Sequence, residues 1–175
     1  MKRLALVLIL IAMGLVALVL VRDVVKKPAG PEETAAPVSV RGVTLYFGSQ
    51  DGSSLVAESR EIKAGGDVLG DLRVVLGGLL AGPTGEGTAL FPAEVALRAV
   101  YIRERTAYLD FSRELVDGFT GGSAGEYLLV ASLVQTVCAN FPEVDAVRVL
   151  VEGEDVDTIG GHLDISRPLR PNDWR

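Results

Sequence analysis

The apolar run from Leu4 to Val21 constrains this chain more than any other feature. A helix rises about 1.5 Å per residue, so an 18-residue helix covers roughly 27 Å. That length is close to the ~30 Å hydrocarbon core of a bilayer. The run therefore predicts one transmembrane helix at residues 4–21, preceded by a cytoplasmic tail at residues 1–3.

A cleaved secretory signal is the alternative to an anchor. Signal peptides have apolar regions of about 7–15 residues that end in a pair of small residues. This run is longer and ends in Leu18-Val-Leu-Val-Arg22, which favours an uncleaved anchor. The only cysteine, Cys138, is far from the N-terminus, so we do not expect a lipid-modified thiol.

The orientation of the anchor follows from the short basic tail. Basic residues flank both ends of the run, so the positive-inside rule discriminates weakly. A tail of three residues with two cations is readily retained in the cytoplasm. We therefore expect a single-pass protein of the cytoplasmic membrane whose C-terminal domain is extracytoplasmic, on the periplasmic or outer side.

The rest of the chain divides into a linker, one domain and a tail. Residues 22–40 are rich in Pro, Ala and Glu, which is typical of a flexible tether. Residues 41–169 are long enough for one folded domain, and residues 170–175 form a Pro- and Arg-rich tail whose Trp174 could dock on the domain or on a partner. Residues 41–175 carry 12 Lys/Arg and 20 Asp/Glu, a net charge of −8, which argues against nucleic acid as a partner.

The periodicity of apolar residues predicts two hairpins, two long helices and a further strand. Asp67 is the expected N-cap of the first helix, and Ser123 with Glu126 has the spacing of a capping box at the second. The expected strands are Val43–Phe47, Leu55–Ile62, Ala96–Ile102, Thr106–Phe111 and Ala146–Val151, and the expected helices are Asp67–Ala81 and Ala124–Asn140.

This order, β-β-α-β-β-α-β, predicts an α+β fold. We expect a two-layer sandwich in which one mixed β-sheet carries both main helices on one face, preceded by the transmembrane helix. The buried stripe of the second helix is expected to include Tyr127, Val130, Leu133, Val134, Val137, Cys138 and Phe141.

Several short motifs together resemble the GerMN domain, a sporulation and germination module of bacterial envelope proteins. The resemblance spans about residues 43–169, and its most specific part is Val151-Glu-Gly153 followed by Gly160-Gly-His-Leu-Asp164. It implies an exported, membrane-tethered module without an established catalytic activity. This chain has one copy, whereas the family's namesakes carry two. The other motifs are Leu45–Phe47, Glu58–Ile62, Leu79–Thr84, Ala107–Ser112, Ser132–Thr136 and Phe141.

His162 is the only histidine, and Asp164 follows it closely. A histidine beside a carboxylate can act as a general base or a metal ligand, but a defined zinc site needs more nitrogen or sulfur ligands. The alternative is a structural residue in a Gly-rich turn, and we expect no catalytic residue, cofactor or metal. The residues named as a candidate ligand or partner surface are Arg60, Glu152, Gly161, His162 and Asp164.

Three functions remain open from the sequence. The first is a non-enzymatic extracytoplasmic module that binds or scaffolds cell-envelope components, either peptidoglycan or envelope proteins. The second is an accessory hydrolase or metal-dependent envelope enzyme that uses His162 and Asp164. The third is a structural envelope module that forms homo-oligomers.

Overall fold

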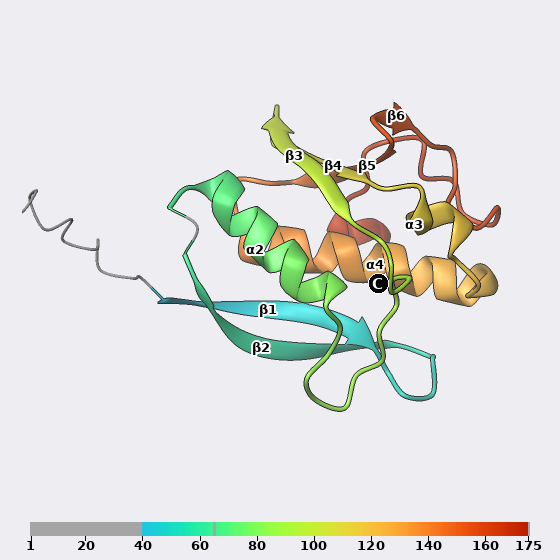
Figure 1. Ribbon diagram of the computed structural model, residues 1–175, viewed down its shortest axis with the longest axis horizontal. Helices are drawn as coiled ribbons and strands as arrows, with labels where there is room; N and C mark the ends of the chain where they lie inside the picture. Colours follow the sequence, from blue (N-terminus) through green and yellow to red (C-terminus); the bar gives the residue numbers. More distant parts are fainter. Residues whose placement is uncertain (1–39, 65, 175) are drawn as a thin grey trace, which may run out of the picture. The chain divides into compact units, whose positions relative to one another are not determined.

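Two separate β-sheets enclose the two long helices of the domain (Figure 1). The computed structural model describes residues 40–64 and 66–174. The smaller sheet is the antiparallel pair β1 (Val40–Gly48) and β2 (Leu55–Lys63). The larger sheet has the order β3 (Leu97–Arg103), β4 (Thr106–Phe111), β5 (Ala146–Val151) and β6 (Glu154–Asp155). The helices are α2 (Val68–Leu80), α3 (Glu114–Asp117) and α4 (Gly122–Asn140), with a final 3-10 turn η1 at Pro171–Asp173.

The expected transmembrane helix at residues 4–21 lies outside the described residues, as do the tail before it and the linker up to residue 39. Within residues 40–64 and 66–174, no helix combines the length and the apolar character needed to cross a bilayer.

The α+β class is confirmed, but the expectation of one sheet with both helices on one face is wrong. Helices α2 and α4 both contact β1 on one side, while α2 contacts β3 and α4 contacts β5 on the other. The helices therefore form a middle layer between two sheets (Figure 1). The larger sheet is mixed, as expected, because β4 pairs antiparallel with β3 and parallel with β5.

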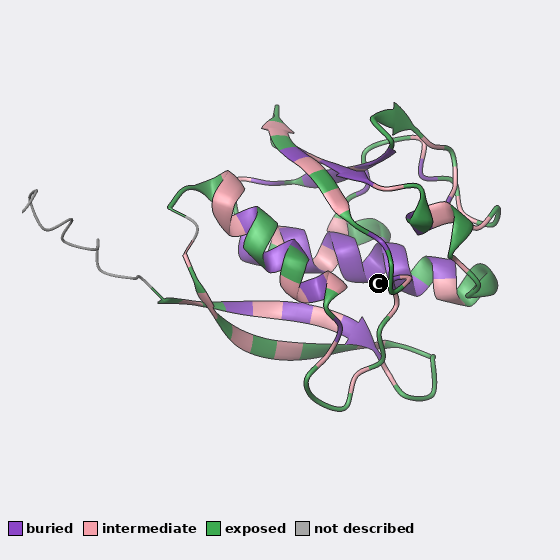
Figure 2. Ribbon diagram, viewed as in Figure 1, coloured by how far each residue is buried: buried purple, intermediate pink, exposed green. Residues whose placement is uncertain are grey.

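Helix α4 is buried on both sides because a sheet covers each (Figure 2). Val130, Leu133 and Val134 are fully buried, which confirms the middle of the expected stripe. Tyr127, at one end of that stripe, is 37% exposed instead. Burial on two sides explains why a single apolar face was an incomplete description of this helix.

Three polar side chains of α4 close the edge of β1 that faces away from β2. Ser132 Oγ donates to the carbonyl oxygen of Tyr46 at 2.5 Å, and Tyr46 N–H donates to Thr136 Oγ1 at 3.0 Å. Asn140 binds both backbone groups of Thr44: its Nδ2 donates to the carbonyl at 2.7 Å and its Oδ1 accepts from N–H at 2.9 Å. We call Ser132, Thr136 and Asn140 the polar ladder.

The spacing of the polar ladder fits the strand. Residues four apart on a helix rise about 6 Å, and residues two apart on a strand rise about 6.7 Å. Helix and strand run antiparallel, since Ser132 and Thr136 bind Tyr46 while the later Asn140 binds the earlier Thr44. The ladder therefore gives β1 hydrogen-bond partners on both edges.

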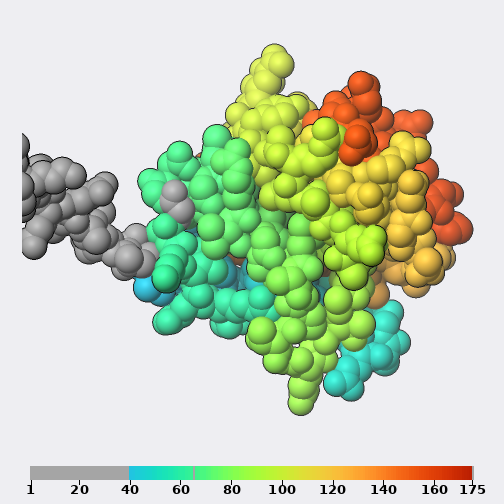
Figure 3. Space-filling model, in the orientation of Figure 1, coloured from blue at the N-terminus to red at the C-terminus, as the bar shows by residue number. Residues whose placement is uncertain are grey.

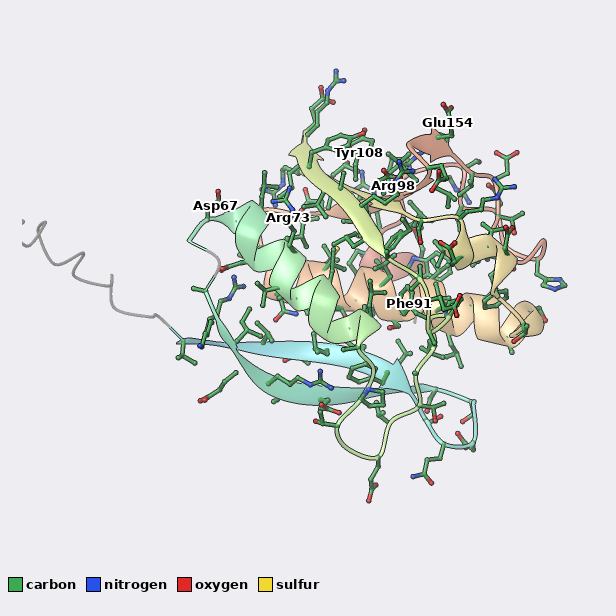
Figure 4. All side chains as sticks on the ribbon, in the orientation of Figure 1. Asp67, Arg73, Phe91, Arg98, Tyr108 and Glu154 are labelled. Atoms are coloured by element: carbon green, nitrogen blue, oxygen red, sulfur yellow. The ribbon has the colours of Figure 1, made fainter. Side chains whose placement is uncertain are left out.

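The two long helices begin differently. Asp67 caps α2 as predicted, because its Oδ1 accepts from Gly70 N–H at 2.6 Å, and Figure 4 shows it at the start of the helix. The capping box predicted for α4 is wrong: the N-cap is Gly121, and no side chain caps the helix there. Glu126 instead accepts hydrogen bonds from residues 158–162.

Replacing Thr136 by Val tests the polar ladder. The change keeps the shape of the side chain but leaves Tyr46 N–H without its acceptor, so we expect the free energy of unfolding to fall by about 1–3 kcal/mol. Urea unfolding followed by the fluorescence of Trp174 measures it. Thr106→Val on β4 is the control, and equal losses for the two variants would contradict this role of Thr136.

Candidate functional site

A buried carboxylate of α4 holds the segment that contains the only histidine. The Glu126 side chain is fully buried, and its two oxygens accept hydrogen bonds from residues 158–162. The donors are Thr158 Oγ1 at 2.6 Å, Ile159 N–H at 2.8 Å, Gly160 N–H at 2.8 Å and His162 N–H at 2.9 Å. Glu126 is therefore a structural anchor for this loop.

These hydrogen bonds keep Glu126 ionised. Burial raises the pKa of its carboxyl, but the N–H of Gly160, the Thr158 hydroxyl and the further backbone donors lower it by more, so the pKa lies below its usual value. A carboxylate saturated with donors and held ionised is poorly suited to transfer protons.

The Gly160-Gly161-His162 stretch has a structural explanation. A Cβ at Gly160 would lie 2.6 Å from Phe119 Cε1, so only glycine allows this approach. Gly161 has φ +85°, which favours glycine. His162 supplies its backbone N–H to Glu126, while the residue itself is exposed.

Asp164 and His162 are not paired in the described part of the chain. Asp164 Oδ1 accepts from Ser166 N–H at 2.9 Å and from Ser166 Oγ at 2.6 Å. These bonds, the hydroxyl first, lower the pKa of Asp164 below its usual value. The carboxylate closes a local turn, and the arrangement does not form the acid-base pair considered from the sequence.

Arg60 joins β2 to the end of α2. Its guanidinium donates to Glu58 Oε1 at 2.6 Å, to Gly78 O at 3.1 Å and to Gly82 O at 2.7 Å. The cation thus supplies the C-terminal end of α2 with the positive charge that its own last turn lacks. Glu58 in turn accepts from Thr84 Oγ1 at 2.6 Å and from Gly85 N–H at 3.0 Å. We call Glu58 and Arg60 the clamp.

Glu152 lies at the turn between β5 and β6. Its φ is +57° and that of Gly153 is +82°, values typical of a tight hairpin turn. Its Oε1 lies 3.0 Å from Arg98 Nη1, and both side chains are largely exposed. Figure 4 shows Arg98 on the larger sheet. An exposed pair of this kind contributes little to stability.

The five residues expected to form one surface therefore occupy three places. Arg60 belongs to the smaller sheet, Glu152 to a turn of the larger sheet, and Gly161, His162 and Asp164 to the loop held by Glu126. The two sheets lie on opposite sides of the helices, so the structure does not bring Arg60 and Glu152 together (Figure 1).

A groove of about 500 Å³ lies between the β1–β2 turn, α4 and the C-terminal turn, and the sequence did not predict it. Its volume is within the range of small-molecule and peptide-side-chain pockets. Figure 3 shows the β1–β2 turn, in cyan, standing out from the rest of the surface. The groove is lined by Tyr46, Ser53, Ser54, Leu55, Tyr127, Leu128, Ala131, Gln135 and Trp174.

The C-terminal turn completes the groove. Gln135 Nε2 donates to Pro171 O at 3.3 Å and to Trp174 O at 3.2 Å, which fixes η1 on α4. The indole of Trp174 is 8% exposed and lies 5.4 Å from the Tyr127 ring, centroid to centroid. Trp174 thus docks on its own domain, one of the two outcomes considered. The feature of the sequence that indicated this contact was Trp174 itself, a single tryptophan in the C-terminal tail.

Glu126→Gln tests the loop anchor. An amide offers one acceptor oxygen where the carboxylate offered two, and each backbone N–H left without an acceptor costs about 1–3 kcal/mol. We expect amide hydrogen exchange at Ile159, Gly160 and His162 to accelerate at least about tenfold. The control is Glu154→Gln on exposed β6, and unchanged exchange in Glu126→Gln would contradict the assignment.

The clamp predicts a pH dependence. Hydrogen bonds from Thr84 first, then Arg60, lower the pKa of Glu58 from 4.5 to about 2. Because the folded pKa is depressed, the stabilisation is fully present above pH 4.5 and is lost as the pH falls towards 2. Glu58→Gln should therefore lower the melting temperature at pH 7, and its difference from the parent should shrink between pH 4.5 and 2. Glu61→Gln, exposed on the same strand, is the control, and a pH-independent difference for Glu58→Gln would refute the prediction.

Comparisons with known proteins agree with the fold. The model of the Germane family, described as sporulation and spore germination, matches residues 44–157. A search of curated proteins gives no match.

Three solved structures are similar to this chain. A candidate lipoprotein of Clostridium perfringens is 24% identical, with a TM-score of 0.55, over 80% of this chain and 95% of that chain. The first GerMN domain of the sporulation protein GerM from Bacillus subtilis is 22% identical, with a TM-score of 0.60, over 76% and 99%. The tandem GerMN domains of GerM are 19% identical, with a TM-score of 0.59, over 82% and 48%. The resemblance found in the sequence is confirmed: this chain belongs to the Germane (GerMN) family of sporulation and spore germination domains.

Proposed function

We propose that this protein is a non-enzymatic, membrane-anchored extracytoplasmic module that binds or scaffolds components of the cell envelope. The observation that carries the proposal is the groove between the β1–β2 turn and α4. Within residues 40–64 and 66–174, its lining is aromatic, aliphatic and neutral polar, without a carboxylate, imidazole, thiol or amino group. Such a lining suits recognition better than acid-base or nucleophilic chemistry.

The groups that could carry chemistry have other roles in the described part of the chain. Glu126 and Asp164 are engaged within the loop, and the exposed His162 contributes its backbone N–H there. Burial raises the pKa of the Cys138 thiol to about 11, so it is protonated at neutral pH. These roles favour binding over the hydrolase alternative.

The location of the module follows from the apolar run at residues 4–21, which has the length of a single membrane span. A related fold occurs in a candidate lipoprotein of Clostridium perfringens, which supports a membrane-tethered member of the family. We infer that the domain is held outside the cytoplasmic membrane by its N-terminal helix.

Site-specific photo-crosslinking in intact cells tests this proposal. A benzophenone amino acid at Tyr127, in the groove, should form adducts with an envelope protein or with peptidoglycan, whereas the same probe at exposed Tyr101 on β3 should form fewer. Equal adducts at both positions, adducts with cytosolic proteins, or none would refute it.

His162→Gln separates binding from the enzyme alternative in the same cells. We expect the variant to form the same adducts at Tyr127 and to restore the phenotype of a deletion strain as well as the parent protein does. A folded variant that keeps its adducts but no longer restores the phenotype would favour the enzyme.

A further inference from the structure

We propose that the groove binds an extended, uncharged, proline-containing peptide segment of an envelope protein. This inference rests on the proposed binding function and names the class of partner. The argument depends on the charge of the groove, the shape of its lining and one buried donor.

Charge selects against an ionic ligand. The domain carries a net charge of −8 over residues 41–175, yet the lining residues of the groove that belong to the described part of the chain include no Asp, Glu, Lys, Arg or His. An acidic segment would be repelled by the domain, and any charged side chain would enter the groove without a partner, which is costly. The fitting occupant is neutral.

The lining favours packing against apolar rings. Tyr46 and Tyr127 contribute aromatic rings, and Leu128 and Ala131, which are 7% and 2% exposed, contribute small buried surfaces. Proline-rich segments are commonly bound in aromatic-lined grooves, because the preformed polyproline II helix packs its rings between aromatic side chains at a low entropic cost.

Trp174 contributes a hydrogen-bond donor that lacks an acceptor in the described part of the chain. Among residues 40–64 and 66–174, its indole Nε1 is the single buried side-chain polar atom without a hydrogen-bond partner. A buried donor without an acceptor is destabilising, so a ligand that supplies an acceptor gains affinity. A polyproline II segment makes no internal hydrogen bonds, so its carbonyl oxygens are free to accept. A small rearrangement of the C-terminal turn would let the indole N–H meet one of them.

A glycan is the less fitting occupant. Sugar recognition needs several polar groups to replace the water around the hydroxyls. Among the described lining residues, the amide of Gln135 already donates to Pro171 O and Trp174 O. The hydroxyls of Ser53 and Ser54 lie on the exposed rim.

Trp174 is the only tryptophan of the chain and thus an intrinsic probe. The full chain, held in lipid nanodiscs so that no detergent enters the groove, is titrated with a capped polyproline octapeptide. A capped Gly/Ser octapeptide and the N-acetylglucosamine tetramer are titrated in parallel. We expect a saturable change in Trp174 fluorescence with polyproline alone.

Three variants locate the binding, and calorimetry measures it independently of fluorescence. Tyr127→Ala removes an aromatic ring from the lining of the groove, and Leu55→Arg places a charge at its rim. Each change should weaken polyproline binding at least about tenfold. Tyr101→Ala is the matched control, because Tyr101 is similarly exposed (44%) and also contacts a ring, that of Tyr108 on the larger sheet, yet lies outside the groove. Circular dichroism checks that each variant is folded.

Each outcome decides the inference. Polyproline binding that is lost in both groove variants and kept in Tyr101→Ala supports it. No polyproline binding, or binding that is equal in all folded variants, overturns it. Binding of the sugar tetramer that Tyr127→Ala abolishes would overturn the peptide class while supporting a binding function. Failure of all three ligands, with envelope adducts still formed at Tyr127 in cells, would refute this inference and leave the proposed function standing.

Discussion

The hydrogen bonds between α4 and β1 are the constraint on which the rest of the structure depends. A two-stranded sheet is marginally stable in water, and an open strand edge invites pairing with other chains. Ser132, Thr136 and Asn140 satisfy that edge from a helix instead of a third strand. The smaller sheet therefore does not need to join the larger one, and both helices can occupy the space between them.

The groove follows from the same geometry. Tyr127, Ala131 and Gln135 are spaced four residues apart on α4. Gln135 lies three residues after Ser132 of the polar ladder, so the two side chains are neighbours on the helix surface. Because the ladder fixes α4 along β1, it also fixes Tyr127 and Gln135 beside Tyr46 and the β1–β2 turn. Stability and the candidate binding surface thus share one helix.

Local patterns in the sequence were sufficient to predict the helices and strands, but not to predict which of them pack or pair together. The strand at Thr106–Phe111 and the cap at Asp67 were predicted correctly, because alternation and capping are local properties. The division into two sheets was not predicted, because the apolar pattern of a strand does not determine which strand it pairs with. Glu126 was assigned to a capping box by its spacing, but a loop more than thirty residues later offers it four donors, and no local pattern carries that contact.

The loop around His162 shows that residue type alone does not identify a catalytic site. Gly160 permits close packing, Gly161 a left-handed backbone, and His162 a backbone N–H, so a stretch that resembles a catalytic loop is explained by the anchoring of a chain segment. The Glu126 carboxylate and the backbone N–H groups that it binds are already satisfied and have little free energy to offer a ligand. Trp174 is the opposite case: among the described residues, its buried indole N–H has no acceptor, and it lines an aromatic groove. Under the proposed binding function, this unmet hydrogen-bonding capacity is what a partner in the groove would satisfy.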